Sequence, residues 1–378
     1  MWRLTFAHKS TISRFVGAAR ACTMTACPYG HATPTIRAQE MNLVEGEQCP
    51  VIGTAPHMPC PIEHPTTLRA PTTYEMASTM GKTQLSAYVA ATALAGYVIG
   101  YGGSPLIAAA LTAGTMLQSC SANTANQVIE VNYDKLMKRT CRRPLPMGHI
   151  TRRNAAFLSA AELAVGTGML ATFSPAAAAL GALNWFLYVG MYTPLKRLSP
   201  TNTWFGSIVG GIPPLMGGLA VSGTISAPVW LLATFLFVWQ IPHFHGLAFH
   251  CRRDYEAAGY KMLAFSNPWR ASFYAVLLSF VMAFLTMAVP ALIDMPVEGA
   301  WYYPVAAVAN AGMIYKSVLF HQAPVRHCRG CFVFSYVYLM IMLGAIMLNH
   351  YQPMHTVNGL IADFTAEEPP LTEKALLA

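Results

Sequence analysis

Nine stretches of about 18 to 24 apolar or small residues recur along this 378-residue chain, and each could cross a bilayer as a helix. Only 11% of the residues are charged, whereas soluble domains carry about 25%. We therefore predict an all-α polytopic membrane protein. The stretches lie near residues 83–102, 105–125, 154–173, 175–193, 205–223, 227–250, 271–293, 301–320 and 331–349.

The basic residues alternate with the predicted spans. The loops after the second, fourth, sixth and eighth spans hold fifteen Lys and Arg, whereas the loops after the first, third, fifth and seventh hold none. Basic loops stay on the side from which a membrane protein is inserted. One misplaced span would destroy this pattern, so it supports the count of nine.

The two ends of the chain differ from its middle. Residues 1–39 are basic, rich in Ser and Thr and free of acids, which is typical of a mitochondrial transit peptide. We expect a proline-rich disordered lead-in over 40–80, a transmembrane domain over 81–350 and a C-terminal tail over 351–378. These features predict a multi-pass protein of the mitochondrial inner membrane, with its basic loops facing the matrix.

Three polar residues follow the second span at four-residue intervals. Asn126, Glu130 and Asp134 would share one face of a helix, about 6 Å apart along its axis. Hard oxygen ligands beside cations at a membrane surface suit a diphosphate that is bound with Mg²⁺. The segment therefore predicts an enzyme that uses an isoprenyl diphosphate. The cations that follow are Lys135, Lys138, Arg139, Arg142 and Arg143.

A second candidate loop follows the sixth span, on the same side as the first. Asp254 comes directly after two arginines, of which Arg253 is its neighbour, and Tyr255 follows it. We expect Asp254 to complete the metal site, with the basic residues holding the leaving group. The end of the same span carries His243, His245 and His250, which could bind a metal, contact an iron porphyrin or hydrogen-bond to the backbone.

A third segment joins the fourth and fifth spans. Tyr192, Lys196 and Arg197 lie there on the basic side, ahead of a helix rich in Gly and Pro. The segment could be a tight turn alone, or its cations could contact a diphosphate or a porphyrin carboxylate. The residues themselves do not separate these alternatives.

Three sequence motifs follow one another along the chain. They are NxxxExxxD with MxRTxxRPL (126–145), YTPLKR…NTWxGxxxGxIPPxMG (192–217) and WQxPHF…RxDYxxxGY (239–260). In this order they resemble the UbiA superfamily of intramembrane prenyltransferases, in particular its haem branch, the protohaem IX farnesyltransferases or haem O synthases. The resemblance runs from about Met80 to Leu348.

The chain departs from the superfamily's usual acidic motifs at three positions. Gln127, Glu130 and Ala258 stand where most of the superfamily has Asp. The haem branch has the same reduced set of acids, so the departures favour haem over a quinone head group as acceptor. Lys82 matches the family's basic residues near the first span only in part, because Gln84 stands where another base is expected.

The resemblance implies transfer of a farnesyl group from farnesyl diphosphate to a vinyl group of haem B, giving haem O and diphosphate. Asn126, Glu130, Asp134 and Asp254 would then hold Mg²⁺ as the catalytic and metal-binding set. The diphosphate would be bound by five cations, and the substrates would contact five further residues. The cations are Lys82, Lys135, Arg139, Arg143 and Arg253. The substrate contacts are Tyr192, Lys196, Arg197, His243 and Tyr255.

Other interpretations remain open at this point. The acceptor could be a phenol such as 4-hydroxybenzoate, or the chain could carry haem or assist oxidase assembly without catalysis. A carrier would place its site near the membrane midplane rather than at one surface. We expect the lipid bilayer as the surroundings, no nucleic acid as a partner, and oxidase-assembly proteins or a second copy of the chain as possible partners. Cys328 and Cys331 form a CxxC pair that we interpret as two incidental thiols.

Overall fold

The computed structural model describes residues 71–295, 297 and 299–350, which all belong to one unit of the chain, residues 56–378. The predicted transit peptide and C-terminal tail, and the lead-in up to residue 70, lie outside the described residues. Within them the secondary structure is helical, with no strand, and the prediction of an all-α fold is confirmed.

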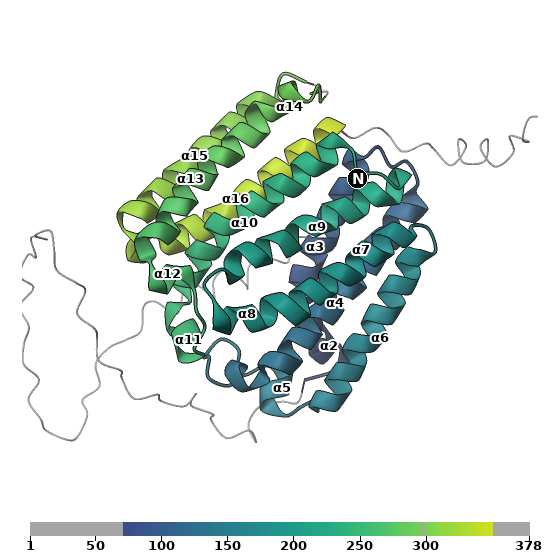
Figure 1. Cartoon of the computed structure of the whole chain (residues 1–378), viewed down its shortest axis with the longest axis vertical. Helices are drawn as coiled ribbons and strands as arrows, with labels where there is room; N and C mark the ends of the chain where they lie inside the picture. Colours follow the sequence, from purple (N-terminus) through teal and green to yellow (C-terminus); the bar gives the residue numbers. More distant parts are fainter. Residues whose placement is uncertain (1–70, 296, 298, 351–378) are drawn as a thin grey trace, which may run out of the picture. The chain divides into compact units, whose positions relative to one another are not determined.

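Each of the nine predicted spans coincides with a long helical segment (Figure 1). The fourth span is built from α7 (Pro175–Phe186), the π-helix η3 (Leu187–Tyr192) and α8 (Thr193–Leu198). The other eight are α3 (Thr83–Ile99), α4 (Pro105–Asp134), α6 (Arg152–Ala171), α9 (Asn202–Ser222), α10 (Ala227–His250), α13 (Pro268–Met287), α15 (Tyr302–Gln322) and α16 (Pro324–His350).

By length and apolar composition, five of the described helices could cross a membrane: α6, α9, α10, α13 and α16. Helix α3 is apolar but shorter. Helix α4 is long enough, but its C-terminal half carries the polar residues of the candidate site. A helix that contributes polar groups to a site is thus less apolar than its neighbours.

N-cap residues with short polar side chains explain where several long helices begin. Ser104, Ser174 and Asn267 each accept a hydrogen bond from a backbone N–H of the first turn, and a proline follows each of them. Such residues satisfy a free N–H group, and proline at the first helical position needs no hydrogen-bond partner of its own.

The prediction of disorder is wrong for the last residues of the lead-in, because Thr73–Gly81 form helix α2. Thr72 and Glu75 make a capping box, in which each side chain accepts from the other residue's backbone N–H. Gln127 of α4 donates from Nε2 to the carbonyl oxygens of Thr79 and Met80, at 3.1 and 2.6 Å. These contacts fix α2 on α4, although the sequence before it is rich in proline.

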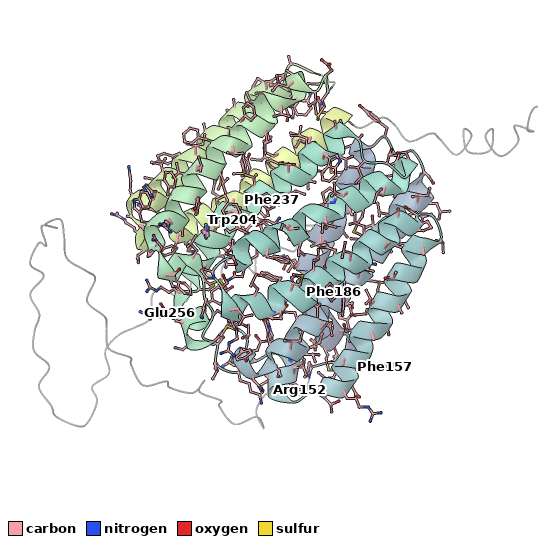
Figure 2. All side chains as sticks on the ribbon, viewed as in Figure 1. Arg152, Phe157, Phe186, Trp204, Phe237 and Glu256 are labelled. Atoms are coloured by element: carbon pink, nitrogen blue, oxygen red, sulfur yellow. The ribbon has the colours of Figure 1, made fainter. Side chains whose placement is uncertain are left out.

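Small residues set the distance between several helices. A Cβ on Gly96 of α3 would collide with the backbone of Pro214 in α9, and one on Gly217 of α9 would collide with Ala93 of α3. Helices in membranes associate closely where such residues meet. Large apolar side chains instead occupy the outside of the bundle, as Phe157 and Phe186 do in Figure 2.

The short elements gather at the ends of the long helices. Figure 1 shows α5 (Pro144–Met147), α8 and α11 (Arg252–Ala257) at one end, and α14 (Val289–Leu292) at the other. Helix α12 (Leu263–Ser266) follows α11. The segments with the predicted acids and cations therefore meet at one end of the bundle, where the site lies.

Candidate functional site

The C-terminal turns of α4 carry the three predicted polar residues on one buried face. Asn126, Glu130 and Asp134 are all buried, with Asp134 only 1% exposed. Asn126 donates from Nδ2 to the Thr193 hydroxyl at 3.0 Å, which links α4 to the start of α8. The predicted helical register is therefore correct, and the face turns toward the protein rather than toward lipid.

Lys196 of α8 reaches Glu130 and forms a buried ion pair. Its Nζ lies 2.9 Å from Oε1 of Glu130 and 4.7 Å from the centre of the Tyr192 ring. The Glu130 carboxylate compensates the charge of the buried Lys196 ammonium group. The segment therefore does more than form a tight turn, because Lys196 pairs with one of the predicted metal-binding acids. Whether its cations also contact a diphosphate or a porphyrin carboxylate stays a prediction.

A π-helical turn places Tyr192 and Thr193 at this site. The turn Leu187–Tyr192 ends just before Pro194, whose ring lacks an N–H and disturbs regular helical bonding. The Thr193 hydroxyl donates to the carbonyl oxygen of Tyr188 at 2.9 Å and accepts from Asn126. The wider turn thus connects the fourth span directly to the polar face of α4.

Asp134 pairs with Arg143, which lies at the start of α5. Arg143 donates from one terminal nitrogen to Oδ2 of Asp134 at 2.8 Å. The other oxygen, Oδ1, is enclosed and has no hydrogen-bond partner among the described residues. A carboxylate oxygen that is buried without a donor is costly, so it marks a place where a cation or a hydrogen-bond donor would be stabilised.

Lys82 joins the same group from the link between α2 and α3. Its backbone is left-handed, with φ of 45°, and its side chain is half-buried. Burial, followed by the positive charges of Arg143 and Lys196, lowers the pKa of Lys82 to about 7. The nearby carboxylates of Glu130 and Asp134 only partly offset this effect. An anion between these cations would stabilise the charged amine.

Asp254 approaches from α11 and contacts the loop after α4. Its Oδ2 accepts a hydrogen bond from the backbone N–H of Arg139 at 3.3 Å, and the Arg139 guanidinium lies 5.9 Å from the centre of the Tyr255 ring. The two predicted loops therefore meet, although they are separated by more than a hundred residues.

Four of the predicted cations lie further out. Lys135, Arg139 and Arg253 are exposed, and Arg253 lines an open pocket of about 530 Å³ with Asp254. Arg197 is exposed as well, stacks 4.2 Å from the centre of the Tyr133 ring and donates to its hydroxyl. The structure thus places the other three predicted cations at the acids and leaves these four at the rim.

The predicted metal ligands supply oxygen atoms from an amide and three carboxylates, which is the donor set that Mg²⁺ prefers. Among the described residues, no three His, Cys, Asp or Glu side chains cluster closely enough to hold an ion by themselves. The Oδ1 of Asp134 is enclosed and has no hydrogen-bond donor among the described residues, so a cation beside it would be stabilised. These donors are compatible with Mg²⁺ only if further oxygen ligands, such as those of a phosphate, complete the site.

The histidines of α10 lie in different surroundings. His243 is buried against α16, where its Nδ1 lies 2.8 Å from the Ser335 hydroxyl. His245 is buried, with its Nε2 enclosed and without a partner, and His250 is exposed at the helix end. None of the contacts found for His243 involves the acids of α4.

Tyr260 is a site residue that the sequence interpretation did not select. Gly259 turns the chain with φ of 70°, and Tyr260 then packs back on Tyr133 and Tyr255. Burial, and then the charges of Glu130 and Asp134, raise the pKa of its hydroxyl. In the sequence, the Gly259–Tyr260 pair after the acidic loop could have indicated this turn back toward the site.

Curated sequences with clear similarity to this chain are mitochondrial protohaem IX farnesyltransferases. The one from Arabidopsis thaliana is 37% identical over 280 residues, covering 71% of this chain and 64% of the relative. The one from Homo sapiens is 36% identical, covering 72% of this chain and 62% of the relative. The chain thus spans somewhat less than two thirds of the length of these relatives.

Solved structures share the fold. A structure of digeranylgeranylglyceryl phosphate synthase matches with a TM-score of 0.63 at 18% identity, covering 73% of this chain and 98% of that one. A UbiA homologue from Archaeoglobus fulgidus bound to DMAPP and Mg²⁺ matches with a TM-score of 0.51 at 15% identity, covering 72% and 99%. The profile of the UbiA prenyltransferase family matches residues 89–348, and the chain belongs to this family.

Proposed function

We propose that this protein transfers the farnesyl group of farnesyl diphosphate to a vinyl group of haem B, giving haem O and diphosphate. The mitochondrial protohaem IX farnesyltransferases to which it is similar support this acceptor and donor. The same relatives and the basic loops support a location in the mitochondrial inner membrane, with the site facing the matrix.

The observation that carries the proposal is the meeting of acids and cations at one end of the bundle. Glu130 and Asp134 are paired with Lys196 and Arg143, and Lys82 stands among them. The two acids lie on α4, and the three cations come from three other segments of the chain. A diphosphate with its metal brings both signs of charge, so it can replace the internal pairing without leaving a buried charge uncompensated.

Asn126, Glu130, Asp134 and Asp254 would hold Mg²⁺ in this site, and the A. fulgidus homologue with a similar fold is bound to DMAPP and Mg²⁺. The ion would neutralise diphosphate charge and so make it a better leaving group. Of the four residues, Asp134 offers an oxygen that has no other partner among the described residues. Asp254 comes from the second loop and would bind from the opposite side of the diphosphate.

The cations of the chain would take up the negative charge that grows on the leaving group. Arg143 and Lys196 lie at the acids, and Lys82 becomes fully charged beside an anion. Arg139, Arg253 and Lys135 would bind the outer phosphate oxygens from the rim. None of these residues needs to give up a proton for the bond to break.

The reaction balances with one water molecule. The C–O bond of farnesyl diphosphate breaks and diphosphate leaves with the electron pair, which gives an allylic cation. The haem vinyl group attacks this cation and forms the new C–C bond. Water then adds to the resulting cation beside the porphyrin ring and loses a proton, which leaves a hydroxyl group. The faces of Tyr192 and Tyr255 would stabilise the allylic cation.

The test is a membrane assay with haem B, farnesyl diphosphate and Mg²⁺, read by mass spectrometry of the extracted haems. The wild type should form a farnesylated, hydroxylated haem. Asp134→Asn should form none while accumulating in membranes to the same level. If correctly inserted wild-type protein gave no such product but prenylated a phenol, the acceptor would be wrong and the site assignment would stand.

A further inference from the structure

The hydrogen bonds around His243 fix which of its nitrogens carries the proton. The Ser335 hydroxyl donates to the carbonyl oxygen of Phe332 at 2.6 Å, so its single proton is already used. The short contact between Nδ1 of His243 and the Ser335 oxygen must therefore be a bond donated by Nδ1–H. Nε2 is then left unprotonated, with its lone pair free.

This arrangement is typical of a histidine that binds a metal through one nitrogen while the other donates to a fixed acceptor. His243 is also held in one orientation. Its ring stacks on Trp239 at 4.7 Å and meets the edge of Tyr336 at 4.6 Å between ring centres. An imidazole that only filled space in the bundle would need neither a fixed tautomer nor a free lone pair.

The Nε2 atom of His243 has no hydrogen-bond partner in the described residues, yet it does not belong to the enclosed unpartnered atoms. The Nε2 of His245 is one of these enclosed atoms, so a ligand as large as a porphyrin cannot lie against it. His243 keeps 6% of its surface exposed, against 1% for His245. His250 is exposed, and no hydrogen bond from the described residues fixes its tautomer. His243 alone of the three is both accessible and oriented.

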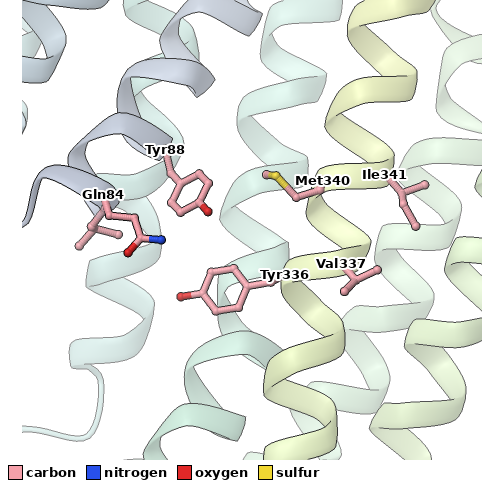
Figure 3. Close-up of a pocket in the computed structure, with 7 residues that line it drawn as sticks. Gln84, Tyr88, Tyr336, Val337, Met340 and Ile341 are labelled. Carbon is pink, nitrogen blue, oxygen red and sulfur yellow. The ribbon is translucent and has the colours of Figure 1, made fainter. Parts of the chain in front are cut away.

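Next to His243 lies a groove of about 610 Å³ between α3 and α16, in the size range of small-molecule sites (Figure 3). Tyr336, which touches His243, lines the groove, and Tyr88 faces it from α3. Leu85, Val337 and Ile341 add apolar surface, and Gln84 lies at one side. Flat aromatic and aliphatic walls of this kind suit a planar apolar ring.

We propose that Nε2 of His243 is the protein ligand of the iron of the haem acceptor, with the porphyrin lying against Tyr336 in the groove between α3 and α16. This inference rests on the proposed function, because it takes haem B as the substrate. It adds what the iron binds and where the ring lies. Imidazole is a common axial ligand of haem iron.

The position of the groove is consistent with transfer. Gln84 and Leu85 belong to the first turn of α3, directly after Lys82, which lies among the charges of the diphosphate site. A porphyrin in the groove is therefore next to the end of the bundle at which the farnesyl cation would form. Its vinyl edge would need no long displacement to meet the donor.

The test compares haem binding by purified full-length variants in detergent. The wild type should show the absorption and EPR spectra of an imidazole-bound ferric haem. His243→Ala should lose these spectra and bind haem at least about tenfold more weakly, and free imidazole should restore the spectra. Ser335→Ala, which removes only the acceptor of Nδ1–H, should weaken haem binding about 10- to 100-fold.

Iron-free protoporphyrin IX separates ligation from packing. His243→Ala should bind it as tightly as the wild type does, because no iron–nitrogen bond is lost. Equal weakening for haem and protoporphyrin would overturn the inference and make His243 a packing residue. Loss of the imidazole spectra in His250→Ala, with His243→Ala unchanged, would overturn it in favour of the exposed histidine.

The farnesyl-transfer assay, run on the same preparations, distinguishes this inference from the proposed function. If the wild type makes haem O but His243→Ala keeps the wild-type spectra, only the assignment of the iron ligand is contradicted. If the wild type shows imidazole-bound haem but makes no product, the proposed reaction is contradicted and the assignment of the ligand stands.

Discussion

The ammonium group of Lys196 lies 2.9 Å from the Glu130 carboxylate, and both side chains are buried between α8 and α4. The pair joins two segments 66 residues apart in the sequence. Because the two buried charges compensate each other beside the other charges of the site, the pair couples the stability of the bundle to the chemistry of the site.

Breaking this pair from one side should destabilise the protein. Lys196→Met leaves the Glu130 carboxylate buried and unpaired, which should cost about 3–5 kcal/mol of unfolding free energy. The double variant Glu130→Gln/Lys196→Met removes both charges and should recover most of the stability but none of the activity. Thermal unfolding in detergent measures the first effect and product formation the second. Lys138→Met, at an exposed cation, is the control, and equal melting of all three variants would contradict the pairing.

Asp254 should matter for turnover rather than for stability. Asp254→Asn keeps the side-chain size and its contact with the backbone of Arg139, so the variant should fold normally. The loss of a negative oxygen at the diphosphate should lower kcat by about 10²- to 10³-fold and raise the Mg²⁺ concentration needed for activity. The matched control is Glu256→Gln on the same helix, whose carboxylate pairs with Arg252 at 2.7 Å on the surface. Similar losses in both variants would remove Asp254 from the site.

The sequence predicted the helices and the acidic face of α4 well, because these depend on local spacing. Nine apolar runs correspond to nine helical segments, and the four-residue intervals from Asn126 to Asp134 place all three side chains on one buried face. The meeting of Asp254 with the first loop could also be expected, since both lie on the basic side of the membrane.

Features that depend on tertiary packing were out of reach of the sequence. Helix α2 is stabilised by Gln127 of α4, 47 residues after Met80. The free nitrogen of His243 follows from Ser335, 92 residues away. Tyr260 becomes a site residue only because Gly259 turns it back toward the acids. No periodic pattern within a single helix encodes such pairings.

Lys82 should make substrate binding depend on pH. Its pKa is lowered to about 7 in the free protein, so its amine is mostly charged at pH 6 and mostly neutral at pH 8. A bound diphosphate raises this pKa, because a nearby negative charge favours the charged amine. The KM for farnesyl diphosphate should therefore be low at pH 6 and rise as the pH passes through about 7. Steady-state kinetics between pH 6 and 8.5 measure the change.

The matched variants for this prediction are Lys82→Arg and Lys82→Met. Arginine keeps its charge throughout this range, so the KM should stay low and lose the rise that Lys82 causes. Methionine has no charge, so the KM should be high at all these values of pH. A rise in KM that is the same in all three proteins would assign the pH dependence to the diphosphate itself.

The contact between α3 and α9 should tolerate no side chain at Gly217. A Cβ there would collide with the carbonyl oxygen of Ala93 and the backbone of Tyr97, which belong to a helix that cannot yield without moving. Gly217→Ala should destabilise the protein by at least about 1–3 kcal/mol, since overpacked cores shift their backbone. It should also lower activity, because α3 carries the groove residues and follows Lys82. Gly168→Ala on α6, where an added Cβ meets nothing within 4 Å, should melt like the wild type. If Gly217→Ala melted like Gly168→Ala, the close approach of α3 and α9 would be wrong.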